Sequence, residues 1–152
     1  MTGVQTCALP IFKHEPWPFT TLKRFEYFLS AREEILDSDY SFYVDVDSLF
    51  IKEIQTSILS GKGMIGTIHP CLFVGPGSPE RNPESKACIP MGSDSRYFCG
   101  GFFGGSSKEF IETSESILSN IQDDLQRGII ADRKSTRLNS SHIPLSRMPS
   151  SA

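Results

Sequence analysis

Apolar residues recur at about the helical period in two parts of this chain. The first part is residues 17–36, which we predict to form a helix. Its expected buried positions are Leu22, Phe25, Phe28, Leu29 and Ile35. The second part begins at Ser106 or Ser107, both good N-cap residues, and runs to about Arg127. Gly128 follows it, as is common after the end of a helix.

Short runs of β-favouring residues alternate with these helical segments. The expected strands cover residues 40–46, 64–69 and 96–103, the last of them broken by a pair of glycines. Residues 48–59 are ambiguous, and residues 74–84, which are rich in glycine and proline, are expected to form a loop. Because strands alternate with helices, the sequence predicts an α/β layer architecture.

The two ends of the chain match the translation of a sequencing-library adapter. Residues 2–11 correspond to ten consecutive adapter codons, and residues 132–142 correspond to eleven codons of its reverse complement. We therefore interpret residues 1–11 as adapter-derived and residues 132–152 as an adapter-derived, disordered tail. Residues 12–131 are then the native segment. A native polar tail is the alternative for the C-terminal end, because its composition also favours disorder.

Removing the two ends changes the charge balance. The whole chain has 15 Lys and Arg against 18 Asp and Glu, whereas residues 12–131 have 11 against 17, a net charge of −6. This acidic balance argues against a nucleic-acid-binding protein, which usually presents a basic face. No apolar run reaches the ~18 residues of a membrane-spanning helix. Cys71, Cys88 and Cys99 have no CxxC spacing, so we expect buried free thiols rather than disulfides or a zinc site.

The candidate chemistry lies at the end of the first expected strand. An apolar run leads into Asp45, Val46 and Asp47, and alternation along a strand would point the two carboxylates to the same side. Two oxygen donors so placed suit a divalent cation, Mn²⁺ or Mg²⁺, which in turn attracts phosphate oxygens. The pair therefore predicts a nucleotide-sugar or phosphoryl chemistry. A solvated pair that caps a turn is the alternative.

Four motifs in series resemble the family 6 glycosyltransferases, which include the histo-blood-group A and B enzymes and the α-1,3-galactosyltransferases. The matching residues are 42–47 (FYVDVD), 66–70 (GTIHP), 79–85 (PERNPES) followed by 89–90 (IP), and 97–106 (YFCGGFFGGS). The resemblance implies a GT-A fold, here incomplete. It also implies retaining transfer of galactose or N-acetylgalactosamine from a UDP-sugar to a galactoside acceptor in α-1,3 linkage, with the Asp-x-Asp pair holding Mn²⁺ against the diphosphate.

The resemblance assigns further donor-binding residues. Arg24 would lie against the donor diphosphate, although its neighbour Lys23 could be mistaken for it by one position. A solvated helix charge is the alternative for Arg24. Cys99, Gly100 and Gly101 match the family's donor-selecting segment. Gly101 leaves space beside the sugar, which favours an acetamido group and hence N-acetylgalactosamine, unless the glycines only relieve crowding on the strand.

The resemblance also points to the acceptor site and to parts that lie elsewhere. His69 and Ser78 would contact the acceptor sugar; a structural histidine and a turn serine are the alternatives. The family's uridine-binding half would precede residue 12, and its catalytic glutamate would follow Ala131. We therefore assign no catalytic residue, and we expect the chain as written to be inactive and poorly stable on its own.

Two other functions fit parts of the pattern. In a phosphatase of the haloacid dehalogenase type, Asp45 would be the nucleophile and Asp47 the acid/base, but residues 48–50 fit that class poorly. A non-catalytic carbohydrate- or cation-binding module is the second alternative. The location stays open: cytoplasmic or membrane-associated in a bacterium, or the Golgi lumen in an animal.

Overall fold

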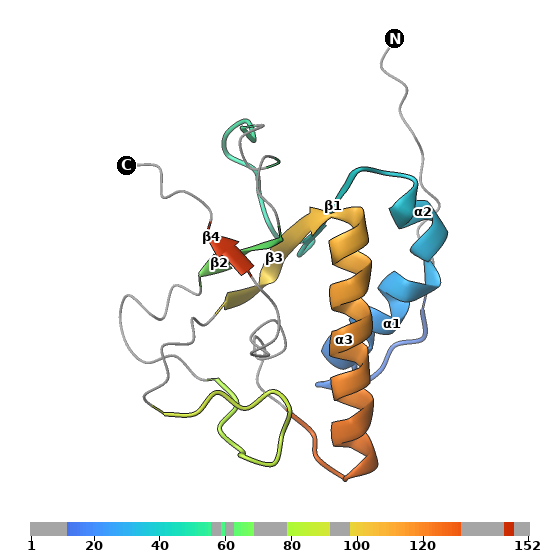
Figure 1. The fold of residues 1–152 in the computed structure, drawn as a ribbon, viewed down its shortest axis with the longest axis vertical. Coiled ribbons are helices and arrows are strands. Elements are labelled where there is room, and N and C mark those ends of the chain that lie inside the picture. The colour runs from blue at the N-terminus through green and yellow to red at the C-terminus, as the bar shows by residue number, and fades with distance from the viewer. Residues whose placement is uncertain are drawn as a thin grey trace.

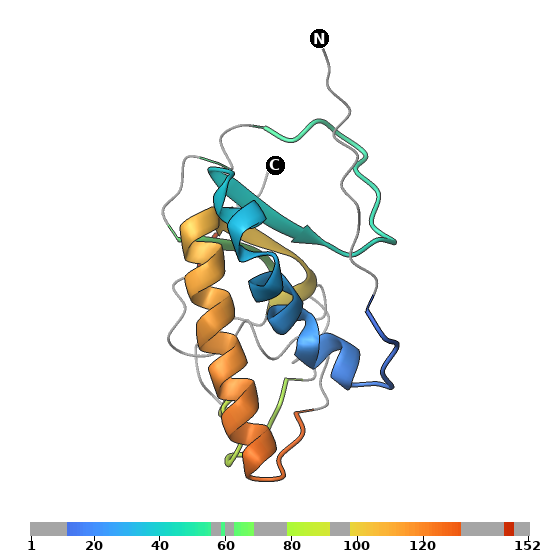
Figure 2. The same cartoon turned by 90° about the vertical axis from the view of Figure 1, so that its right-hand side faces the viewer.

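The structure, a computed structural model, describes residues 12–55, 59, 63–68, 79–91, 98–131 and 145–147. The helices and strands in chain order are α1 (Phe19–Ser30), α2 (Arg32–Leu36), β1 (Tyr40–Val44), β2 (Met64–Ile68), β3 (Phe98–Ser106), α3 (Ser107–Gln126) and β4 (Leu145–Arg147). The helices lie on one side of the sheet, and α1 runs beside α3 (Figures 1 and 2). The predicted mixture of helices and sheet in layers is confirmed.

The sheet has the strand order β1-β3-β2-β4, so β1 is an edge strand. β3 pairs antiparallel with both β1 and β2, whereas β4 pairs parallel with β2. β4 lies in the segment predicted to be a disordered tail, and these three residues form a strand instead. The β1–β3 register pairs Val44 with Phe102, which places Asp45 beside Gly101 at the open end of the edge strand.

Two predicted elements differ from those in the structure. The helix expected over residues 17–36 is divided at Ala31, whose backbone N–H donates to the Phe28 carbonyl three residues earlier instead of four. The third strand is not broken by its glycines and continues to Ser106. Glycine is required there by close packing, because a Cβ on Gly104 would lie 2.4 Å from the Ser41 carbonyl oxygen of β1.

The start and end of α3 agree with the sequence pattern. The Ser106 hydroxyl accepts a hydrogen bond from the Glu109 N–H, and the Glu109 side chain accepts one from the Ser106 hydroxyl, so a first-turn amide has a partner. Gly128, after the end of the helix, has φ +72°, a conformation that favours glycine. Ser106 is therefore the N-cap residue, and Ser107 is the first residue of the helix.

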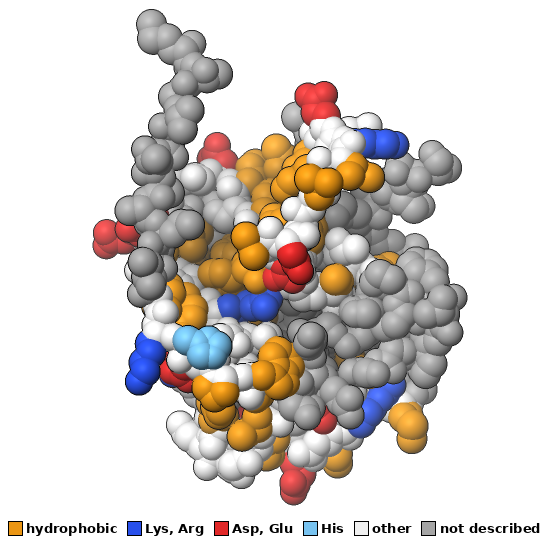
Figure 3. Space-filling model, turned by 180° about the vertical axis from the view of Figure 1, so that it is seen from behind, with side chains coloured by type: hydrophobic (Ala, Val, Ile, Leu, Met, Phe, Trp, Pro, Cys, Tyr) orange, Lys and Arg blue, Asp and Glu red, His pale blue; other side chains and the backbone are white. Residues whose placement is uncertain are grey.

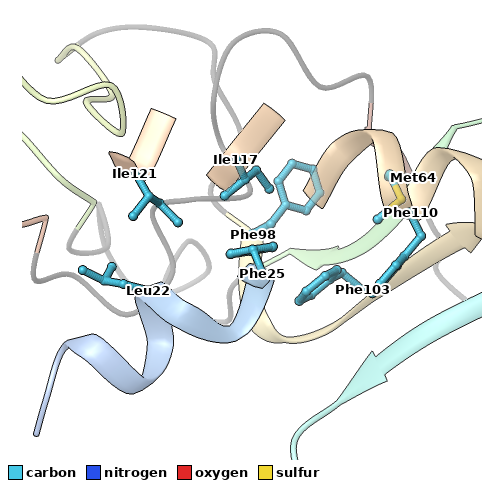
Figure 4. Packing of buried hydrophobic residues seen from close by; sticks show 8 residues of the cluster. All are labelled: Leu22, Phe25, Met64, Phe98, Phe103, Phe110, Ile117 and Ile121. Atoms are coloured by element: carbon cyan, nitrogen blue, oxygen red, sulfur yellow. The ribbon is translucent and has the colours of Figure 1, made fainter. Parts of the chain in front are cut away.

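A cluster of buried apolar side chains joins α1, α3, β2 and β3 (Figure 4). Phe103 of β3 is only 1% exposed, and its ring lies 5.9 Å from that of Phe110 on α3 and 6.2 Å from that of Phe25 on α1. The other members of the cluster are Leu22, Met64, Phe98, Ile117 and Ile121. This core holds α1 against the sheet, and thereby fixes the position of the polar residues that α1 carries at the edge of β1.

A buried carboxylate fastens the loop of residues 79–91 to the end of α3. Asp124 is 1% exposed and accepts hydrogen bonds from the Ser85 hydroxyl (2.7 Å), the Lys86 N–H (2.9 Å) and the Arg127 guanidinium (2.6 Å). Ser85 therefore helps to join this loop to α3.

Two further predictions concern the cysteines, expected to be buried free thiols, and the length of apolar segments. Cys88 and Cys99 are free thiols, each half-buried rather than fully buried. Cys71 lies outside the described residues. No helix in the described part of the chain is long and apolar enough to cross a membrane.

Candidate functional site

The candidate site begins where β1 ends. The Asp45 N–H still donates to the Gly101 carbonyl of β3 (2.9 Å), but the Ser48 N–H donates to the Asp45 carbonyl (3.0 Å), so the chain turns immediately after Asp45. Val46 is fully exposed in this turn. The alternation expected for a strand therefore stops at Val44, and Asp47 is placed by a turn and not by the strand.

Both carboxylates of the acidic pair act on the Tyr43 hydroxyl. This hydroxyl donates a hydrogen bond of 2.5 Å to Asp45 Oδ1. Burial and this hydrogen bond raise the pKa of Tyr43, the nearby Arg24 opposes the rise, and the negative charges of Asp45 and Asp47 add to it, so that the pKa is about 12. The Asp45 carboxylate and the Arg24 guanidinium thus both contact Tyr43, and Tyr43 stays a neutral hydrogen-bond donor at physiological pH.

Arg24 reaches this site from α1. Its Nη1 donates to the Gly100 carbonyl (2.8 Å), and its guanidinium carbon lies 4.5 Å from the centroid of the Tyr43 ring, a cation–π distance. The adjacent Lys23 instead pairs with Glu15 at 2.5 Å. The structure therefore places Arg24, and not Lys23, among the residues at the end of β1.

The glycines predicted to select the donor lie beside Asp45 and Arg24. A Cβ added to Gly101 would be 2.7 Å from Asp45 Oδ2, closer than two such atoms can approach. Glycine at this position thus leaves room for the carboxylate. Gly100 contributes the carbonyl that holds Arg24. The structure brings Arg24, Asp45 and this glycine pair together from α1, β1 and β3, as the sequence hypothesis requires.

The carboxylate oxygens of Asp45 and Asp47 suit a hard cation whose other ligands come from a phosphate group. Among the described residues, no group of three or more His, Cys, Asp or Glu side chains is close enough together to hold a metal. Mg²⁺, a cation of this kind, is commonly bound by only one or two protein carboxylates together with water and substrate phosphates. Asp45 and Asp47 fit that pattern, with Arg24 as a neighbouring positive charge.

The remaining predicted residues are divided between this site and undescribed parts of the chain. Cys99 is half-buried on β3, next to Gly100. The predicted acceptor residues His69 and Ser78 lie outside the described residues. Figure 3 shows the face opposite to that of Figure 1, where hydrophobic side chains gather and acidic and basic side chains lie close together near the middle.

Sequence reasoning assigned no role to Tyr43, the residue that contacts Asp45 most directly. The spacing of the two residues could have predicted the contact. Residues two apart on a strand point to the same side, and Tyr43 precedes Asp45 by two. The buried Asp124 was missed too. It follows Ile117 and Ile121 on the apolar face of α3, where a carboxylate requires partners.

Together, the mixed helix-and-sheet fold and the acidic pair beside an arginine define a site suited to a cation and a phosphorylated ligand. Comparison with known proteins agrees with this class. The sequence profile described as glycosyltransferase family 6 matches residues 2–149, nearly the whole chain. The chain belongs to glycosyltransferase family 6. The match includes most of both terminal segments, and the adapter origin of those segments stays a prediction.

Two curated relatives show how much of the family this chain represents. The histo-blood group ABO system transferase 1 of Rattus norvegicus is 28% identical over 134 residues, which cover 85% of this chain and 38% of the relative. The O-antigen biosynthesis glycosyltransferase WbnI of Escherichia coli is 28% identical over 120 residues, which cover 76% of this chain and 50% of the relative. The chain thus spans half or less of the length of these relatives.

Proposed function

We propose that this chain is part of a retaining glycosyltransferase with a GT-A fold that transfers galactose or N-acetylgalactosamine from a UDP-sugar to a galactoside acceptor in α-1,3 linkage. Membership of family 6 supports glycosyl transfer in general. The observation that carries the proposal is the convergence of Asp45, Arg24 and the glycines of β3 at the end of β1. One ligand that combines a diphosphate with a sugar would use all of these groups.

Asp45 and Asp47 would hold a divalent cation, Mn²⁺ or Mg²⁺, together with the donor diphosphate. When bound, the cation neutralises the negative charge that develops on the departing diphosphate. Asp45 and Asp47 carry two negative charges, which the cation would balance. Arg24 carries a positive charge, so its guanidinium can bind phosphate oxygens of the same diphosphate. Its hydrogen bond to Gly100 and its contact with Tyr43 keep it in place before the ligand arrives.

The donor sugar would lie beside residues 99–101. Because Asp45 Oδ2 adjoins the position of a Gly101 side chain, a sugar attached to a diphosphate at Asp45 must pass close to that glycine. The resemblance of residues 99–101 to the family's donor-selecting segment supports N-acetylgalactosamine over galactose, although Asp45 Oδ2 takes the space directly beside Gly101. His69 and Ser78 are proposed to contact the acceptor.

The proposal is tested with a gene product of the length of the curated relatives, recovered by resequencing the source locus. With Mn²⁺ and a galactoside acceptor, we expect transfer from UDP-N-acetylgalactosamine to exceed transfer from UDP-galactose. We also expect transfer to be lost in Asp45→Asn and in a protein freed of metal by a chelator. Transfer by the native protein that continues without metal would contradict the role of the acidic pair.

The same variant separates this proposal from the phosphatase hypothesis, which the family comparisons do not favour. A phosphatase would hydrolyse a phosphate monoester such as p-nitrophenyl phosphate and would lose that activity in Asp45→Asn. A glycosyltransferase would not hydrolyse the phosphate monoester, either as the wild-type protein or as Asp45→Asn. A binding module without catalytic activity would retain sugar binding in the Asp45 variant.

A further inference from the structure

Tyr43, which hydrogen-bonds to Asp45, is packed against three other side chains. Its ring lies 5.1 Å from that of Phe103 and 5.5 Å from that of Phe28, and the Arg24 guanidinium covers it at 4.5 Å. Phe103 belongs to the buried core, so the ring of Tyr43 is packed against that core. The hydroxyl at the end of this ring therefore occupies a fixed position.

The fixed hydroxyl holds one oxygen of Asp45. It donates to Oδ1 at 2.5 Å, while Oδ2 lies beside Gly101, only 2.7 Å from where a Cβ would be. The backbone of Asp45 is held as well, through its N–H and the Gly101 carbonyl at 2.9 Å. With the main chain and one oxygen held, the second oxygen has a defined direction in which to meet a ligand.

We propose that Tyr43 is a positioning residue that orients the Asp45 carboxylate so that its second oxygen binds the divalent cation. The inference rests on the proposed metal-binding function of Asp45 and Asp47. Residues that hydrogen-bond to a metal ligand fix its orientation, and their loss typically lowers metal affinity 10- to 100-fold. Tyr43 does not touch the cation or the sugar; it acts through Asp45 alone.

The test compares two tyrosine variants on the same strand. Tyr43→Phe keeps the packed ring and removes only the hydroxyl, whereas Tyr40→Phe removes a hydroxyl from an exposed residue of β1 and serves as the matched control. Mn²⁺ binding to the full chain is followed by electron paramagnetic resonance of the free ion. We expect the Kd to rise about 10-fold in Tyr43→Phe and to stay unchanged in Tyr40→Phe.

The outcomes separate the inference from the function on which it rests. Wild-type affinity in Tyr43→Phe, together with loss of binding in Asp45→Asn, would overturn the role of Tyr43 and leave the metal site intact. Equal Mn²⁺ binding by the wild-type chain and by Asp45→Asn would overturn the metal site itself. Circular dichroism of the variants shows whether a change in affinity comes from unfolding.

A measurement on the unmodified protein keeps the inference testable if Tyr43→Phe fails to fold. The ¹³Cζ resonance of a tyrosine responds to the hydrogen bond of its hydroxyl. Addition of diamagnetic Mg²⁺ to the wild-type chain should shift this resonance for Tyr43 and not for Tyr40. Mg²⁺ binding that shifts the Asp45 carboxyl resonance without any shift at Tyr43 would overturn the inference.

Discussion

Replacing Asp124 with asparagine should destabilise the fold by about 3 kcal/mol. Asp124 accepts hydrogen bonds from Ser85, Lys86 and Arg127 at 2.6–2.9 Å while only 1% exposed. Asparagine keeps the size but replaces one acceptor oxygen with an NH₂ group that faces these donors. The change removes hydrogen bonds to a charged group, each worth about 1.5–3 kcal/mol, and leaves a buried donor unpaired.

Urea unfolding followed by circular dichroism measures this loss. Trimethylamine N-oxide can be added to define the folded baseline, because it favours the compact state of a marginally stable chain. The matched control is Asp123→Asn, which removes a neighbouring carboxylate that is 46% exposed and pairs with Lys86 at 3.4 Å. Exposed pairs contribute about 0–1 kcal/mol, so the control should lose less than about 1 kcal/mol.

Amide hydrogen exchange gives the local counterpart. The Lys86 N–H donates to Asp124, and its protection should fall in Asp124→Asn further than global destabilisation alone requires. Losses of equal size in the Asp123 and Asp124 variants would refute the reasoning, since burial of the carboxylate would then make no difference.

The remaining predictions concern single positions in β3 and the glycine that follows α3. The Gly104, Gly128 and Ser106 variants are measured by urea unfolding. Gly104→Ala should cost at least about 2 kcal/mol because its Cβ would meet the β1 backbone at 2.4 Å, whereas Gly128→Ala, with no atom within 4 Å but a φ of +72°, should cost about 1 kcal/mol. Ser106→Ala should cost about 1 kcal/mol through the lost N-cap. Gly101→Ala should displace the Asp45 carboxylate and weaken Mn²⁺ binding several-fold, measured by calorimetry.

Each of these predictions has an outcome that contradicts it. A smaller loss in Gly104→Ala than in Gly128→Ala would show that the two strands separate easily. An unchanged midpoint in Ser106→Ala would mean that the cap contributes nothing to stability. Unaltered Mn²⁺ affinity in Gly101→Ala would show that Asp45 binds the cation in another orientation.

The spacing of apolar residues predicted most of the helices and strands, because a helix or strand that buries one face has apolar residues at regular intervals along it. The apolar period of α3, its serine cap and Gly128 correctly marked both ends of that helix. The glycines of β3 misled, since glycine usually weakens a strand. Here Gly104 is needed because β1 lies too close to allow a side chain, a fact that only the paired strands reveal.

The candidate site was predicted in its residues but not in its geometry. Asp45, Arg24 and the glycines of β3 do converge, since strand pairing brings residue 45 beside residue 101. The turn at Asp45 was not predicted, because it depends on a hydrogen bond from Ser48 that no periodicity encodes. The role of Tyr43 depends on the packing of its ring against α1 and β3, which is a tertiary property.

The central claim is that Asp45 and Asp47 hold a divalent cation against a diphosphate. Broadening of the ³¹P resonances of UDP by Mn²⁺ tests it most directly, because the effect depends on the distance between the two when both are bound to the protein. We predict that the wild-type gene product of the length of the curated relatives enhances the broadening and that Asp45→Asn/Asp47→Asn abolishes the enhancement. The exposed acids Asp37 and Asp39, changed together to asparagine, provide the control. Equal enhancement by this wild-type gene product and its Asp45/Asp47 variant would contradict the account.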